Sequence, residues 1–135
     1  MKQVLAALLL LGAVPASATT VEVATGNNWN SIPLARERNV AIDMEAIGAI
    51  HEMVESGECV LPGQRKGKLD LTVPFLIHFA ADGSVDRLVI QRMGCAKAEG
   101  VIAGALLKLL DARAYRPTGV NPNGWYRNEV SFSYL

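Results

Sequence analysis

The feature that most constrains the fold is a run from Leu69 to Phe79 in which apolar and polar residues alternate. Successive side chains of a β-strand point to opposite faces, so this pattern predicts a strand with one face against a core. Leu76 is an apolar exception on the polar side. The residues on the apolar side are Leu69, Leu71, Val73, Phe75, Ile77 and Phe79.

Two more strands are predicted from the same kind of signal. Asp82-Gly83 is a strong hairpin turn signal, and Val85–Arg92 then provides the returning strand. Residues 125–134 alternate again up to the end of the chain, with Asn128 interrupting the apolar side. A terminal strand of this kind is expected at a sheet edge, where its outer backbone groups have no partner.

Two helices complete the predicted elements. In Asn39–Ser56, apolar residues recur at three- and four-residue spacings, and Gly57 follows as a stop signal. Ala96–Arg113 carries a broad apolar stripe. Because a helix and a one-faced sheet each need a layer to cover them, these segments predict an α+β fold.

The predicted fold is a three-stranded antiparallel or mixed sheet with both helices packed on one face, in the order α-β-β-α-β. A right-handed crossover would place the first strand between the second and the third. Pro74 then falls in the central strand, where it removes a ladder donor. A bulge near Pro74, or a ladder that starts only after it, would reconcile the two observations.

The beginning of the chain indicates export. Lys2 precedes an apolar run of about eleven residues, Val4–Val14, which is too short to span a bilayer, and Ala16-Ser17-Ala18 fits a signal-peptidase site. We therefore expect a cleaved signal peptide at 1–18, a largely irregular lead-in at 19–39 and one domain at 40–135. The mature chain would be periplasmic and would not insert into a membrane.

Composition argues against several partners. After Lys2 is removed, 12 basic and 13 acidic side chains remain of the 13 of each in the whole chain. This balance gives no electrostatic attraction to nucleic acid or to an anionic membrane. No nucleophile motif, phosphate loop or paired carboxylates stand out, so neither an enzyme nor a cofactor is expected.

The two cysteines, Cys59 and Cys95, predict a disulfide, because paired cysteines in an exported protein are usually bonded to each other. The bridge would close a loop of about 36 residues and stabilise the fold by up to ~4 kcal/mol. The alternative is a metal or thiol site that uses both cysteines with His51 and His78, although their spacing matches no recognised metal motif.

The order of these motifs resembles the C-terminal domain of the TonB family. The resemblance rests on VPFLIHFAADGSVDRLVIQR, a following helix, then AYRP and the terminal NEVSFSYL. It covers about Asp43–Leu135. It implies a non-catalytic, periplasmic protein-binding module that takes up an extended segment of an outer-membrane transporter, or of another envelope protein, by strand addition.

The expected binding residues lie on the terminal strand, whose free edge would pair with a partner or with a second copy. The candidates are Trp125, Arg127, Asn128, Glu129 and Ser131. The chain departs from the family in lacking an uncleaved membrane anchor, a Pro-rich spacer and a Tyr-Pro element before the first helix. The resemblance therefore implies the fold and the binding mode without energy transduction.

Overall fold

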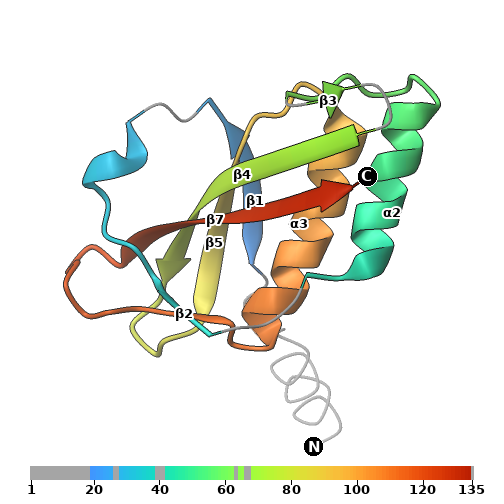
Figure 1. Cartoon of the computed structure of the whole chain (residues 1–135). Coiled ribbons are helices and arrows are strands. Elements are labelled where there is room, and N and C mark those ends of the chain that lie inside the picture. The colour runs from blue at the N-terminus through green and yellow to red at the C-terminus, as the bar shows by residue number, and fades with distance from the viewer. Residues whose placement is uncertain (1–18, 26–27, 39–41, 63, 66–67, 135) are drawn as a thin grey trace, which may run out of the picture.

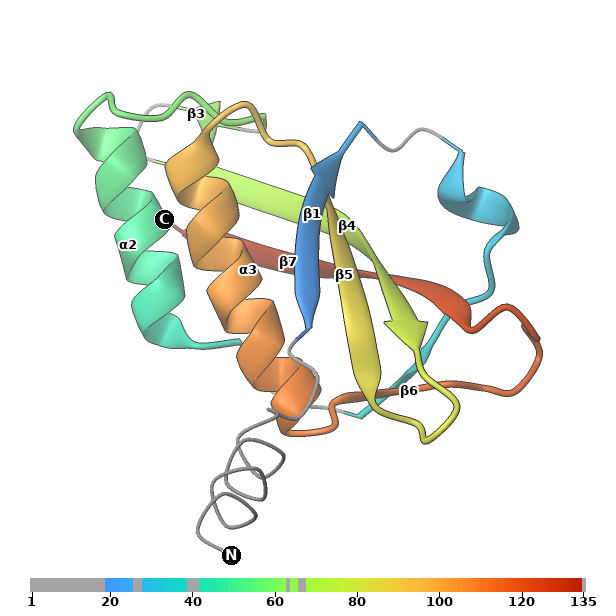
Figure 2. The same ribbon diagram turned by 180° about the vertical axis from the view of Figure 1, so that it is seen from behind.

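In the computed structural model of the chain, the described residues are 19–134 apart from 26–27, 39–41, 63 and 66–67. The predicted signal peptide lies outside them. The main sheet is mixed and is backed by two helices on one side (Figures 1 and 2). Its strands are β1 (Thr20–Ala24), β3 (Gln64–Arg65), β4 (Lys68–Phe79), β5 (Val85–Gln91) and β7 (Trp125–Tyr134).

The long strand β4 organises the sheet. It pairs along one side with the whole of β7 and along the other with β5, both antiparallel. β1 lies outside β5 and runs parallel to it, while β3 pairs with the beginning of β4. A separate two-stranded ribbon is formed by β2 (Arg36–Glu37) and β6 (Tyr115–Arg116).

The α+β class is confirmed, and β4 lies between β5 and β7 as predicted. The predicted count of three strands and the order α-β-β-α-β are wrong. The segment expected to be irregular contains β1, the short 3-10 helix η1 (Trp29–Ser31) and β2, and the two-residue strands β3 and β6 lie in segments predicted as loops. β1 does alternate, with Val21 and Val23 on one side. Five residues are too few for that signal to decide the structure, and β1 forms because β5 offers it an edge.

Pro74 lies where its missing donor does no harm. The β4–β5 ladder begins only at Phe75, which pairs with Ile90, so the second of the two expected solutions holds on the β5 side. On the other side, Pro74 is opposite Glu129 in the β7 ladder. Phe79 N donates to Gly124 O across this ladder, so the bonded pairs fall on odd-numbered β4 residues and Pro74 occupies a non-bonded position.

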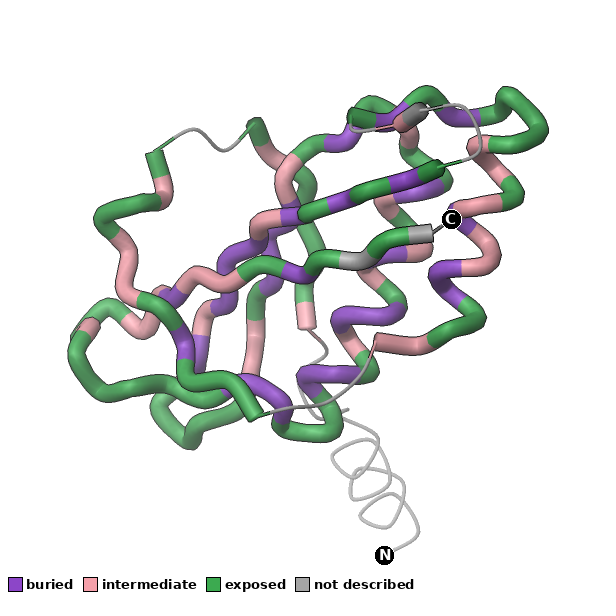
Figure 3. Tube along the Cα trace, viewed as in Figure 1, coloured by how far each residue is buried: buried purple, intermediate pink, exposed green. Residues whose placement is uncertain are grey.

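The helices are α2 (Met44–Glu55) and α3 (Ala96–Asp111), both shorter than predicted. α2 begins late because the Asp43 side chain accepts a hydrogen bond from Glu45 N and so acts as the N-cap. One core joins both helices to the sheet, and alternate β4 residues are buried along its length (Figure 3). Among the largest fully buried side chains are Phe75, Ile77, Leu88, Ile102 and Leu106.

The opposite side of the sheet is partly covered by the lead-in. β1 lies at one edge and residues 33–35 lie beside β7 at the other, and η1, which lies between them in the sequence, is on the side away from the helices (Figures 1 and 2). Leu76 and Val89 pair in register on that side and are 9% and 6% exposed. Both side chains are thus buried on this side of the sheet as well, which is why Leu76 breaks the alternation.

Candidate functional site

The outer edge of β7 is the site that the sequence predicted, and its backbone geometry divides it in two. Arg127 N donates to Pro33 O at 2.9 Å, and Arg127 O accepts from Ala35 N at 2.9 Å. Arg127 therefore directs both of its backbone groups away from β4. By the two-residue period of a strand, Glu129, Ser131 and Ser133 face the same way.

The first part of this edge is closed by the chain itself. Arg127 Nε donates to Ile32 O at 2.6 Å, and Asn128 Nδ2 donates to Ala35 O at 3.3 Å. Asn128 Oδ1 in turn accepts from Glu129 N at 2.8 Å. Two predicted partner-binding side chains, Arg127 and Asn128, thus hold the lead-in against β7, and the Asn128 amide ends that pairing.

The rest of the edge, Glu129–Ser133, is called the open edge below. Its backbone N–H groups at Ser131 and Ser133 have no strand partner within the described part of the chain. Their hydroxyls are already engaged with β4, since Ser131 Oγ lies 2.9 Å from Thr72 Oγ and Ser133 Oγ donates to Asp70 Oδ1 at 2.7 Å. Glu129 is exposed. A partner at this edge would therefore be recognised mainly through the backbone.

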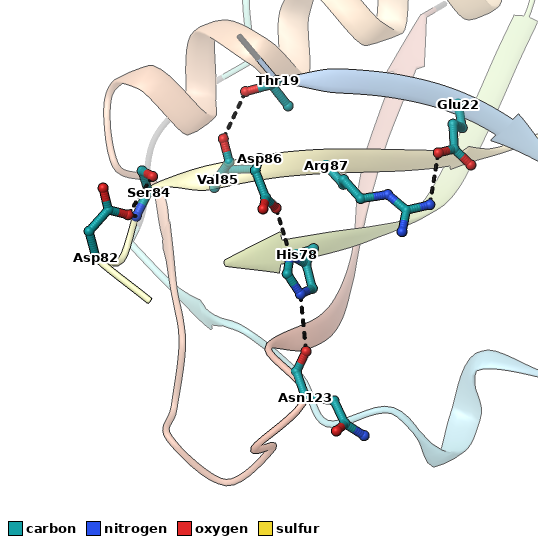
Figure 4. Close-up of polar contacts among 9 residues, drawn as sticks. All are labelled: Thr19, Glu22, His78, Asp82, Ser84, Val85, Asp86, Arg87 and Asn123. Atoms are coloured by element: carbon teal, nitrogen blue, oxygen red, sulfur yellow. Dashed lines mark hydrogen bonds and ion pairs between the residues drawn. The ribbon is translucent and has the colours of Figure 1, made fainter. Parts of the chain in front are cut away.

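Trp125 lies away from the open edge. Its ring packs on His78, with centroids 4.9 Å apart, and the guanidinium carbon of Arg87 lies 4.9 Å from its centroid. Arg87 also pairs with Glu22 of β1 at 2.8 Å (Figure 4). This predicted binding residue instead belongs to a cluster that links β1, β5, β4 and β7 on the side away from the helices.

His78 forms the most specific polar contact of this cluster. Its Nδ1 lies 2.6 Å from Asp86 Oδ1 and its Nε2 lies 3.1 Å from Asn123 O (Figure 4). The ladder shifts register between His78 and Phe79, which places Asp86 beside the ring. A carboxylate–imidazole pair can serve catalysis, but here both nitrogens face hydrogen-bond acceptors. The pair fastens the 121–124 turn to the hairpin.

The predicted Cys59–Cys95 disulfide is confirmed, with Cα atoms 5.7 Å apart. It joins the loop after α2 to the residue that precedes α3. Neither cysteine is then available as a thiolate ligand, His51 lies 3.9 Å from Glu55, and His78 is engaged as described. Over the described residues, no three His, Cys, Asp or Glu side chains gather to hold a metal ion.

A second site was not found by sequence reasoning. It is a cleft of about 1060 Å³ between the end of α3, the β4–β5 turn and the β2–β6 ribbon. Its charged lining comes from separate segments, which is why no local motif indicated it. We call it the basic cleft, because four cationic residues line it: Arg36, Lys108, Arg113 and Arg116. Asp111 is the one carboxylate among the lining residues.

None of the helices in the described segments is long and apolar enough to cross a membrane. Comparison with family models, with curated proteins and with solved structures found no match for this chain.

Proposed function

We propose that this protein is a non-catalytic binding module of the bacterial periplasm that takes up a partner strand at the open edge, in the manner implied by its resemblance to the TonB C-terminal domain. The observation that carries the proposal is the unpaired backbone of Ser131 and Ser133 beside a closed segment at Arg127. Unpaired edge groups are what an added strand satisfies. The partner would be an extended segment of an outer-membrane transporter or of another envelope protein.

Two features support a short and defined docking site. The Asn128 amide satisfies Glu129 N from within the chain, so among the described residues of the open edge the outward donors left for a partner strand are those of Ser131 and Ser133. The serine hydroxyls are bonded to Thr72 and Asp70, which fixes this end of β7 against β4. A preorganised edge lowers the ordering cost of binding.

The test is an amide NMR titration with peptides from the extended segments of envelope transporters. We expect saturable shifts centred on Ser131 and Ser133, and we expect Ser131→Pro to abolish them because it removes an outward donor. Ser131→Ala is the matched control, since it removes the same hydroxyl contact with Thr72 and leaves the N–H in place. Val130→Pro is unsuitable, because Val130 pairs with Val73 and its N–H faces β4.

Ser131→Pro must retain the wild-type circular dichroism spectrum for the comparison to count. Shifts confined to other elements, or equal binding by Ser131→Pro and wild type, would reject strand addition at this edge. The open edge could instead pair with another copy of this chain. Analytical ultracentrifugation across a range of protein concentrations tests for that self-association. Self-association lost in Ser131→Pro and kept in Ser131→Ala would assign the open edge to a homodimer.

A further inference from the structure

The β2–β6 ribbon places two arginines opposite each other. Arg36 and Arg116 are register partners in this antiparallel pair, so their side chains leave the same face, and both line the basic cleft. Like charges directly opposite on a ribbon are destabilising. Within the described residues, neither guanidinium has a hydrogen bond or an ion pair. Two neighbouring positive charges are thus left without a counter-charge at the wall of a cleft.

The other cations around the cleft have local explanations. Lys108 pairs with Asp43 at 2.8 Å. Hydrogen bonds from Ser84 are the main cause of the lowered pKa of Asp82, and the charge of Arg113 makes only a small further contribution. Both cations also lie near the C-terminus of α3, where positive charge is favoured. Lys108 thus has a counter-charge, whereas neither ribbon arginine has one among the described residues.

The remaining titratable neighbours do not cancel that pair. Glu37 pairs with Tyr115, and since neighbouring strand residues alternate in direction it leaves the ribbon on the other face. Burial, with a contribution from Glu37, raises the pKa of Tyr115 to about 12, so its phenol is neutral at physiological pH. Asp111 is the single carboxylate among the residues that line the cleft.

The chemistry of the two guanidinium groups indicates which kind of ligand they would bind. A guanidinium offers a planar fork of N–H donors that matches phosphate oxygens, and two guanidiniums match the two charges of a phosphate monoester. A single carboxylate would neutralise only one of them. The cleft of about 1060 Å³ exceeds the size of a free phosphate ion, and half-buried Val85 and Leu107 add apolar lining.

From this arrangement we infer that the basic cleft binds the phosphate group of a phosphomonoester, held between Arg36 and Arg116. Lys108 and Arg113 add positive charge at the periphery. The site is separate from the open edge of β7, so it provides a second binding function that does not depend on strand addition.

The experiment is an amide NMR titration of the folded chain with inorganic phosphate and with glycerol 3-phosphate, at low and at physiological salt. We expect saturable shifts of cleft amides such as Gly83, Ser84 and Arg113. Arg36→Gln and Arg116→Gln should each weaken binding about tenfold or more, because each removes a charge-assisted contact. Arg92→Gln removes an exposed arginine outside the cleft and should bind as wild type does.

Thermal unfolding gives an independent readout. Without ligand, Arg36→Gln should unfold at or above the wild-type temperature, because the cross-strand repulsion is relieved. Phosphate should raise the unfolding temperature of the wild type and have little effect on the Arg36→Gln/Arg116→Gln double variant. A loss of stability in Arg36→Gln would show that the ribbon arginines are structural.

A third experiment distinguishes a lipid headgroup from a soluble phosphomonoester as the ligand. Co-sedimentation with phosphatidylcholine vesicles, with and without phosphatidic acid, tests a lipid headgroup against the soluble monoester. Binding to either source that is lost in the double variant and kept in Arg92→Gln supports the inference. No saturable shift with phosphate or glycerol 3-phosphate and no vesicle binding, or equal losses in all three single variants, would overturn it.

Discussion

At the scale of the residue, Gly124 shows how a single position connects loop to sheet. Its φ of +78° lies in the left-handed region, and a Cβ there would lie 2.7 Å from Phe79 O and 3.2 Å from His78 Nε2. Phe79 N donates to Gly124 O at 2.9 Å, so the two backbones must approach closely just before β7 begins. Only glycine meets both requirements.

Gly124→Ala should therefore destabilise the protein more than a matched glycine does. Gly119 has a φ of +83°, and no atom of another part of the chain lies within 4 Å of where its Cβ would be, so Gly119→Ala tests backbone strain alone. We expect Gly119→Ala to cost about 1–2 kcal/mol, and Gly124→Ala to cost about 1–3 kcal/mol more, from crowding against Phe79. Urea unfolding measures both, and equal losses would contradict the close approach.

At the scale of the element, Asp43 performs two tasks with its two carboxylate oxygens. Oδ1 accepts from Glu45 N at 3.0 Å and caps α2, while Oδ2 accepts from Lys108 Nζ at 2.8 Å and links α2 to α3. The Lys108 hydrogen bond, with the smaller contribution of Glu45 N, holds the pKa of Asp43 below its usual 3.8. The two helices are thereby fixed relative to each other.

This linkage predicts a dependence of stability on acid. Because the folded pKa of Asp43 is lowered, its contribution is present above pH 3.8 and is lost as pH falls through the folded value. Asp43→Asn, which keeps a capping oxygen, should lower the melting temperature by a few degrees at pH 6 and converge with wild type near pH 2.

Lys108→Gln removes the same ion pair from the other side and should reproduce the result of Asp43→Asn. Asp43→Ala loses the cap as well, so it should melt below both variants at every pH. Thermal unfolding followed by circular dichroism from pH 2 to pH 7 measures these differences. A constant gap between Asp43→Asn and wild type across this range would exclude the ion pair as the cause.

At the scale of the whole molecule, a disulfide and a long-range backbone pairing add to the core that joins the layers. The Cys59–Cys95 bridge joins the two helices across 36 residues of sequence, which include all of β4 and β5. The lead-in runs from β1 to the edge of β7 on the other side of the sheet.

Opening the disulfide should lower the unfolding free energy by about 3–4 kcal/mol, because the unfolded chain regains the entropy of a 36-residue loop. Urea unfolding of the wild type with and without a thiol reductant measures this effect without changing a side chain. Cys59→Ala/Cys95→Ala should fall at least as low, since Cys59 is 2% exposed and its sulfur is lost from the core. Equal stability of the oxidised and reduced wild type would contradict the loop argument.

Much of the fold and only part of the candidate site could be predicted from the sequence. Alternation identified β4 and β7, and the Asp82-Gly83 turn correctly predicted the hairpin. Of the predicted binding residues, Glu129 and Ser131 lie on the open edge. Arg127 and Asn128 are engaged by the lead-in and Trp125 packs on His78. No local sequence pattern indicates which distant segment a side chain will hydrogen-bond to or pack against.

Local sequence signals were sufficient to predict helices and strands long enough to show their period, a turn that needs glycine, and the bond between the two cysteines of the chain. The tertiary structure alone decided that β1 pairs with β5, that the lead-in closes half of the β7 edge, and that Arg36 and Arg116 face each other. Periodicity is a property of neighbouring residues, whereas an edge or a cleft exists only after segments far apart in the chain have packed together.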